Sequence, residues 1–169
     1  AALKALEPAL PAARRTALLS ELREHLRWEM RATHHTCISP VSGLLAILTL
    51  RGTDAKDPDA EKAIDAFDGW VWEDEEKGAR VCGARSASWD SAFAAQALAA
   101  AAPHLDVRGP LAKVDAFLAT QQMQGGTGDE ASYFRIDPTG GYCFAGVWHG
   151  WPVSDCTAEA LLGRIEAQG

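Results

Sequence analysis

The residues best suited to acid chemistry lie in the segment GWPVSDCTAEA, which occupies residues 150–160. Asp155 follows Ser154 at the predicted start of a helix, where unpaired backbone N–H groups and the helix dipole favour the ionised form of a carboxylate. Such a position strengthens the acid and suits a proton donor. It is also a position at which Ser154 or Asp155 commonly caps a helix, and on position alone the cap is the favoured interpretation.

The other polar candidates carry weaker signals. His34 and His35 lie close to a cysteine, which indicates a metal cluster only weakly, and we predict no metal site. His149 could border the acid, but the favoured position for it is a loop that faces solvent.

The chain is too long to need disulfides and shows no export signal, so four free thiols are expected, at Cys37, Cys82, Cys143 and Cys156.

Composition limits the class of protein. The chain has 169 residues, 47% of them apolar and 23% charged, which is typical of one globular domain over residues 1–169. A formal net charge of −7 disfavours nucleic acid as a partner. The longest strongly apolar run, at residues 44–50, is too short to cross a membrane, so a cytoplasmic location is expected. The chain begins without Met, and we expect Ala1 to be an internal or trimmed end of a longer chain.

Helical patterns must position the acid. Apolar residues recur at helical spacing over residues 16–31, and Ser39-Pro40 and Asp57-Pro58 are typical helix starts. Six helices are predicted, at residues 16–31, 40–48, 58–71, 88–102, 110–122 and 154–168. Residues 72–87, with the charge run from Glu73 to Glu76, are predicted to form a solvated loop without a strand. Any small strand content is expected in residues 125–151.

Several motifs together resemble the oxidosqualene cyclases, a family of triterpene cyclases. VSDCTAE at residues 153–159 resembles the acid motif of this family, and SWDSAFAAQAL at residues 88–98 resembles its WDTAFA-x-QAL helix. Residues 38–42 and 68–83 also resemble family segments. A set of five residues resembles the repeated QW motif, with tyrosine in place of the tryptophan: Lys113, Phe117, Gln121, Gly140 and Tyr142. The resemblance implies an all-α fold, in which paired helices form part of an α/α barrel, or toroid.

The resemblance also implies roles for individual residues. Asp155 would be the general acid that protonates an epoxide, and Cys156 would strengthen it by donating an S–H hydrogen bond to the carboxylate. Family members use a second cysteine for this, from a segment without a match here. Trp89 and Phe144 would face developing carbocations with their aromatic rings. Without the resemblance, both would be interpreted as core residues. Packing roles are expected for Trp70, Trp72, Trp148 and Trp151.

The predicted function is therefore that of an oxidosqualene cyclase-like isomerase segment, which starts polycyclisation of 2,3-oxidosqualene to a sterol-type triterpene without a cofactor. A squalene-hopene cyclase is one alternative, although its D-x-D-D acid cluster keeps only Asp155 here. A non-catalytic isoprenoid-binding or scaffold module is another. The implied partners are an isoprenoid substrate and either the remainder of a cyclase chain or a second copy. A full-length protein could also attach peripherally to a membrane, and the 169-residue chain alone is expected to be inactive.

Overall fold

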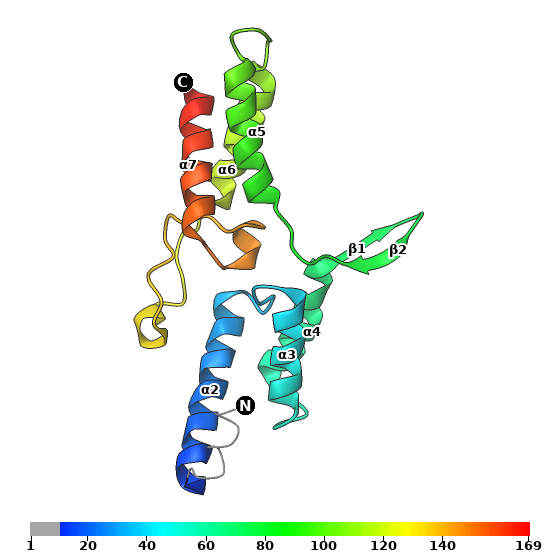
Figure 1. The fold of residues 1–169 in the computed structure, drawn as a ribbon, viewed down its shortest axis with the longest axis vertical. Helices are drawn as coiled ribbons and strands as arrows, with labels where there is room; N and C mark the ends of the chain where they lie inside the picture. The colour runs from blue at the N-terminus through cyan, green and yellow to red at the C-terminus, as the bar shows by residue number, and fades with distance from the viewer. Residues whose placement is uncertain (1–10) are drawn as a thin grey trace, which may run out of the picture.

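A computed structural model describes residues 11–169 and contains the six predicted helices. The helices form two groups of three, one below the other in Figure 1. The first group comprises α2 (Ala12–Ala32), α3 (Pro40–Arg51) and α4 (Pro58–Ala66). The second comprises α5 (Ala87–Ala101), α6 (Arg108–Gln121) and α7 (Ser154–Gln168). The all-α fold is thus confirmed, while closure into an α/α barrel and the single-domain assignment stay predictions. The first ten residues of that domain lie outside the described part.

Local side-chain chemistry explains where the helices of the first group begin. Oγ of Ser39 accepts a hydrogen bond from the backbone N–H of Ser42, and Oγ of Ser42 accepts one from the backbone N–H of Ser39, which forms a capping box before Pro40. Asp57 accepts bonds from the backbone N–H groups that follow Pro58 and so caps α4. These two dipeptides predicted the starts of α3 and α4 correctly.

The segment after α4 differs from the prediction. α4 ends at Ala66, a 3-10 turn follows over Phe67–Trp70, and two antiparallel strands then form, β1 (Val71–Asp74) and β2 (Gly78–Val81). Asp74 closes the hairpin turn by accepting two backbone N–H groups, and Gly78 takes a φ of +65°. The prediction of a loop was wrong because both strands are largely exposed, and such strands show no apolar alternation.

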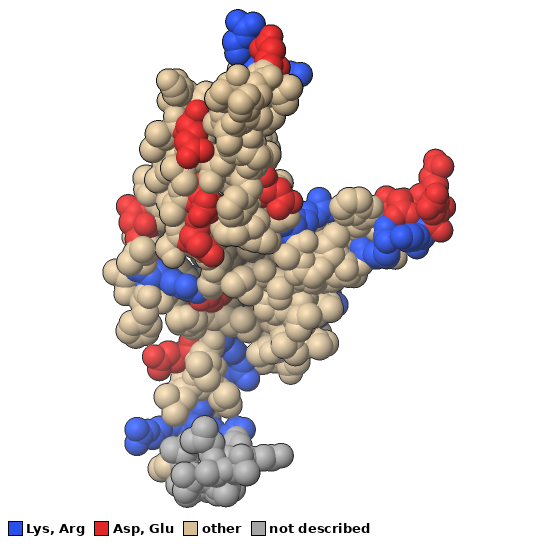
Figure 2. All heavy atoms as spheres, turned by 45° about the horizontal axis from the view of Figure 1, so that its top comes forward, with Lys and Arg blue, Asp and Glu red and all other residues tan. Residues whose placement is uncertain are grey.

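The hairpin carries the charge run into solvent. Figure 2 shows acidic and basic side chains gathered at the tip of this projection. Trp72 of β1 is 57% exposed, so the prediction that it packs in the interior was wrong. In residues 125–151, where strand content was expected, no strand forms. The structure has only isolated bridges around this segment, between Gln122 and Tyr142 and between Cys143 and Pro152.

Each helix group encloses its own apolar cluster. In the first, Met30 and Leu50 are fully buried between α2, α3 and α4. In the second, the small residues Ala92 and Ala95 of α5 let α7 approach closely, and a Cβ added at Gly163 would lie 2.7 Å from the carbonyl oxygen of Ala92. The alanine-rich sequence of α5 therefore serves close packing of helices.

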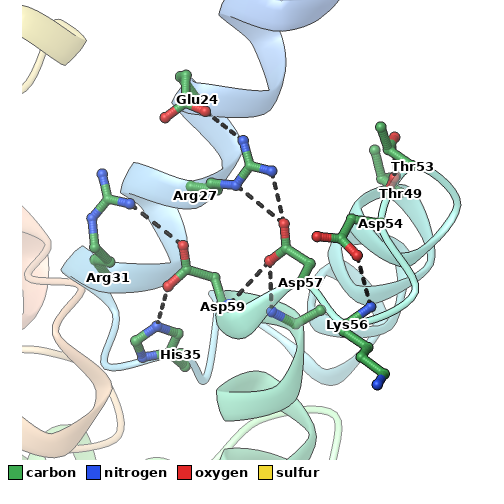
Figure 3. Close-up of polar contacts among 11 residues, drawn as sticks. Glu24, Arg27, Arg31, His35, Thr49, Thr53, Asp54, Lys56, Asp57 and Asp59 are labelled. Atoms are coloured by element: carbon green, nitrogen blue, oxygen red, sulfur yellow. Dashed lines mark hydrogen bonds and ion pairs between the residues drawn. The ribbon is translucent and has the colours of Figure 1, made fainter.

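A polar cluster joins α2 to α4 (Figure 3). Asp57 is 1% exposed, and its Oδ2 accepts hydrogen bonds from Nη2 of Arg27 at 2.7 Å and from Nε at 3.3 Å. Burial alone would raise the pKa of Asp57, but bonds from Arg27 and from the α4 backbone hold it below the ordinary value. Next to this pair, Asp59 accepts from His35 at 3.0 Å and contacts Arg31 at 3.5 Å.

The outer face of α3 is apolar and exposed. Val41, Leu44, Leu45 and Leu48 are spaced at helical intervals and are between 48% and 67% exposed. Association with a second copy or with further cyclase sequence, predicted from the sequence, stays a prediction.

No helix in the described residues is long and apolar enough to span a membrane.

Candidate active site

Asp155 stands in the first turn of α7 and is exposed. The N-cap of this helix is Val153, whose side chain forms no cap, so neither Ser154 nor Asp155 is the N-cap residue. The favoured interpretation from position alone was therefore wrong. The Oδ1 of Asp155 accepts a hydrogen bond from the backbone N–H of Cys156 at 2.8 Å.

Cys156 is buried directly behind this carboxylate, with 2% of its surface exposed. Burial, together with the negative charge of Asp155 and a hydrogen bond to it, raises the pKa of the thiol to about 12. The thiol therefore stays protonated at neutral pH and can act as a donor. Cys143 is also buried, but its Sγ lies 3.6 Å from the sulfur of Met123. All four cysteines are free, as predicted.

A pocket of about 260 Å³ opens beside the acid. Its wall combines Asp155 of α7 with aromatic and apolar side chains from segments between the helices, including Phe144, Trp70 and Ile38. Arg85 also lines it and donates to the carbonyl oxygen of Val71. The site therefore places one exposed carboxylic acid against a largely apolar wall.

The structure brings the two predicted aromatic residues together. The ring centroids of Trp89 and Phe144 lie 5.8 Å apart, and the backbone N–H of Trp89 donates to the carbonyl oxygen of Phe144. Phe144 lines the acid pocket, whereas Trp89 packs against it and against the edge of Phe93, at 4.8 Å. Both residues are half-buried beside the apolar cluster of the second helix group.

His149 does not face solvent, so that prediction was wrong. It is 4% exposed, and its Nε2 lies 3.1 Å from the carbonyl oxygen of Cys37, a residue 112 positions earlier. The ring packs edge-on against Trp70, and burial lowers its pKa. Nothing in the local sequence indicates burial, because the contacts come from a distant segment.

Neighbouring bonds hold the loop before α7, residues 142–153, and the 3-10 turn Phe67–Trp70 against the segment at the end of α2. His34 Nδ1 donates to the carbonyl oxygen of Trp148 at 2.9 Å, and Trp70 Nε1 donates to that of Thr36 at 2.9 Å. Gly150 has a φ of +65°, and a Cβ there would lie 2.2 Å from the carbonyl oxygen of Ala32. Only glycine fits this close approach. In the described residues, no group of three or more His, Cys, Asp or Glu side chains could hold a metal ion.

Of the QW-like residues, Gln121 bonds to the same loop. Oε1 of Gln121, at the end of α6, accepts from the backbone N–H of Val147 at 3.1 Å, three residues after Phe144. Tyr142 is fully buried, and its hydroxyl oxygen accepts from Arg164 of α7 at 3.3 Å. The other members are Gly140, with a φ of +83°, Phe117, which packs against the second cluster, and Lys113, which is exposed on α6.

A larger groove of about 890 Å³ lies on the other side of the loop before α7. It runs between α2, residues 125–141 and the first turns of α7, and Trp151 and Val153 line both this groove and the acid pocket. Arg135 stacks over Trp151 at 3.9 Å and forms an ion pair with Glu29 of α2. Sequence reasoning missed this groove and the wall residues Trp70, Ile38 and Arg85 of the acid pocket.

Comparison with known proteins identifies relatives of this chain. The chain is 33% identical over 148 residues to alpha-onocerin synthase LCD of Lycopodium clavatum, 31% over 154 residues to lanosterol synthase of Homo sapiens, and 28% over 143 residues to cycloartenol synthase of Dictyostelium discoideum. These alignments cover 84% to 89% of the chain but only 19% to 21% of the relatives. No protein-family model matches the chain. By sequence, the chain is thus a relative of the oxidosqualene cyclase family of triterpene cyclases, and it spans about one fifth of the length of these proteins.

Proposed function

We propose that this chain forms the acid-bearing part of an oxidosqualene cyclase active site, in which Asp155 protonates the epoxide of 2,3-oxidosqualene. The observation that carries the proposal is that Asp155 and Phe144 line one pocket while a protonated Cys156 adjoins the carboxylate. The proton of the carboxylic acid passes to the epoxide oxygen, and a carbon–oxygen bond breaks with its electron pair moving to oxygen. The carbocation that remains drives ring closure, and loss of a proton from the last cation gives a neutral sterol-type triterpene.

The aromatic pair supports the later steps of this proposal. A cation over an aromatic ring gains about 0.5 to 2 kcal/mol, and the ring offers no nucleophile that would trap it. Phe144 lines the pocket directly. Trp89 supports Phe144 through a ring contact and a backbone hydrogen bond. We therefore assign Phe144 to cation stabilisation and Trp89 to support of that ring.

Replacing Phe144 with Leu should shift the products toward incompletely cyclised species, because the cation loses its aromatic partner while apolar volume is retained. Product chromatography of the full-length protein measures the shift, and the melting temperature measures stability. Phe93→Leu serves as the matched control, since Phe93 contacts Trp89 but does not line the pocket. A large loss of stability with an unchanged product profile would make Phe144 a core residue only.

The two alternative functions predict different outcomes with two substrates. A squalene-hopene cyclase protonates the alkene of squalene, but at the positions of its acid cluster, residues 153–156, this chain has a single carboxylate. A non-catalytic isoprenoid-binding module is favoured by the exposure of Asp155, because water quenches carbocations and weakens electrostatic contacts.

Incubation of the full-length protein and of the 169-residue chain with oxidosqualene and with squalene separates these functions. We expect the full-length protein to convert only the epoxide and the 169-residue chain to convert neither, because its acid remains open to water. Conversion of squalene would favour the squalene-hopene alternative. Binding without product from the full-length protein would favour the non-catalytic module.

A further inference from the structure

Thr157 belongs to the acid motif but does not line the acid pocket. Its hydroxyl forms two hydrogen bonds: Oγ1 donates to the carbonyl oxygen of Val153 at 2.8 Å and accepts from the backbone N–H of Tyr142 at 2.9 Å. A carbonyl oxygen only accepts and a backbone N–H only donates, so both roles of the hydroxyl are fixed. The second bond reaches a residue 15 positions earlier, in the loop that precedes α7.

Both backbone polar groups of Tyr142 bind the helical turn that carries Asp155. Its N–H donates to Thr157, two positions after the acid, and its carbonyl oxygen accepts from the backbone N–H of Val153, two positions before the acid, at 3.1 Å. Tyr142 is fully buried, and its hydroxyl is bonded to Arg164 further along α7. The turn is thus bonded on both sides of Asp155 to one buried residue.

The segment that begins with Tyr142 also carries the aromatic wall of the pocket. Phe144 lies two residues after Tyr142 and lines the pocket, and its carbonyl oxygen accepts from the backbone N–H of Trp89 at 3.3 Å. Residues 142–144 are therefore bonded to the acid turn at one end and to α5 at the other. Because Asp155 and Phe144 lie on two segments that the Thr157 hydroxyl joins, this hydroxyl helps to set their relative position.

We propose that Thr157 is a positioning residue that fixes the carboxyl group of Asp155 relative to the ring of Phe144. The inference rests on the proposed function, in which the acid opens the epoxide and the ring faces the cation that follows. Displacement of a reacting group by about 1 Å can lower a rate about 10²-fold. Thr157 acts through Asp155, so its loss should lower the rate of the chemical step more than the affinity for substrate.

Thr157→Val tests this role, because valine keeps the shape of threonine and lacks the hydroxyl. In the full-length protein we expect kcat for oxidosqualene to fall about tenfold to 10²-fold, while KM changes by less than about twofold. Thr157→Ser keeps the hydroxyl and should restore most of kcat. Thr49→Val is the matched control and should keep the wild-type kcat. Oγ1 of Thr49 donates to the carbonyl oxygen four residues earlier, as in Thr157, but has no second partner among the described residues.

Amide hydrogen exchange in the 169-residue chain tests the bond to Tyr142 without turnover. In Thr157→Val the backbone N–H of Tyr142 loses its acceptor, and its exchange should become about threefold to tenfold faster, the ratio that one net hydrogen bond supplies. Exchange at Tyr142 should stay at the wild-type rate in Thr157→Ser and in Thr49→Val. If Thr157→Val fails to fold, Thr157→Ala allows the same two measurements, with changes expected in the same directions.

Three results would overturn the proposal: unchanged exchange at Tyr142, equal kcat in Thr157→Val and Thr49→Val, or failure of Thr157→Ser to restore kcat. Failure of the proposed function gives a different result, absence of turnover in the wild-type full-length protein. Exchange at Tyr142 would even then show whether the Thr157 hydroxyl joins the acid turn to the segment that carries Phe144.

Discussion

Asp155→Asn is expected to lower the rate of oxidosqualene cyclisation by the full-length protein about 10²- to 10⁴-fold, the range for loss of a general acid. An amide has no acidic proton to transfer, and no other carboxylic acid among the described residues lines the pocket. Stability should change little. Asp155 is exposed, and the Oδ1 of asparagine can still accept the hydrogen bond from the backbone of Cys156. Product chromatography measures the rate, and thermal unfolding measures the stability.

Asp90→Asn is the control for this experiment. Asp90 lies in the first turn of α5, so it shares the helix-start position of Asp155, but it is bonded to Ser86 and does not line the pocket. We expect the Asp90 variant to keep the wild-type rate. Wild-type turnover in Asp155→Asn would remove Asp155 from the mechanism, and an equal loss in both variants would point to a general electrostatic effect.

Asp57→Ala should lower the free energy of unfolding by about 3 kcal/mol, because the half-buried Arg27 loses its buried ion-pair partner and keeps only the exposed Glu24. The same substitution removes the cap of α4, which adds about 1 kcal/mol to the loss. Chemical denaturation of the 169-residue chain measures the effect. Asp54→Ala is the control, since Asp54 is exposed and accepts only a local bond from the Lys56 backbone. A loss no larger than that of the control would show that the pair in Figure 3 contributes little.

The pH dependence of the Asp57 effect has a definite sign. The folded state holds the pKa of this carboxyl below its ordinary value of about 4. The charged form therefore stabilises the fold fully above the ordinary pKa, and this contribution is lost as the pH falls through the lower folded value. The stability difference between wild type and Asp57→Asn should thus be largest near neutral pH and shrink in acid. A difference that grows below pH 4 would contradict this assignment.

Most of the secondary structure follows from neighbouring residues. Ser39-Pro40 and Asp57-Pro58 each combine a capping side chain with a proline that needs no N–H partner, so the starts of α3 and α4 are encoded locally. Apolar spacing likewise predicted α2 and α6. The hairpin after Trp70 escaped prediction, because its side chains lie in solvent and the turn depends on Asp74 and the positive φ of Gly78.

Part of the candidate site was likewise predictable from neighbouring residues, and part was visible only in the tertiary structure. The sequence by itself singled out Asp155, Cys156 and Trp89 as candidates, because these lie in short contiguous motifs, and the resemblance to the cyclases added Phe144. Only the tertiary structure decided that Phe144 shares a pocket with Asp155, that Trp89 stands behind it, and that His149 is buried. The reason is distance along the chain. The bond that orients His149 joins its ring to the carbonyl oxygen of Cys37, 112 residues away. A local sequence pattern does not show which distant backbone group a side chain will contact.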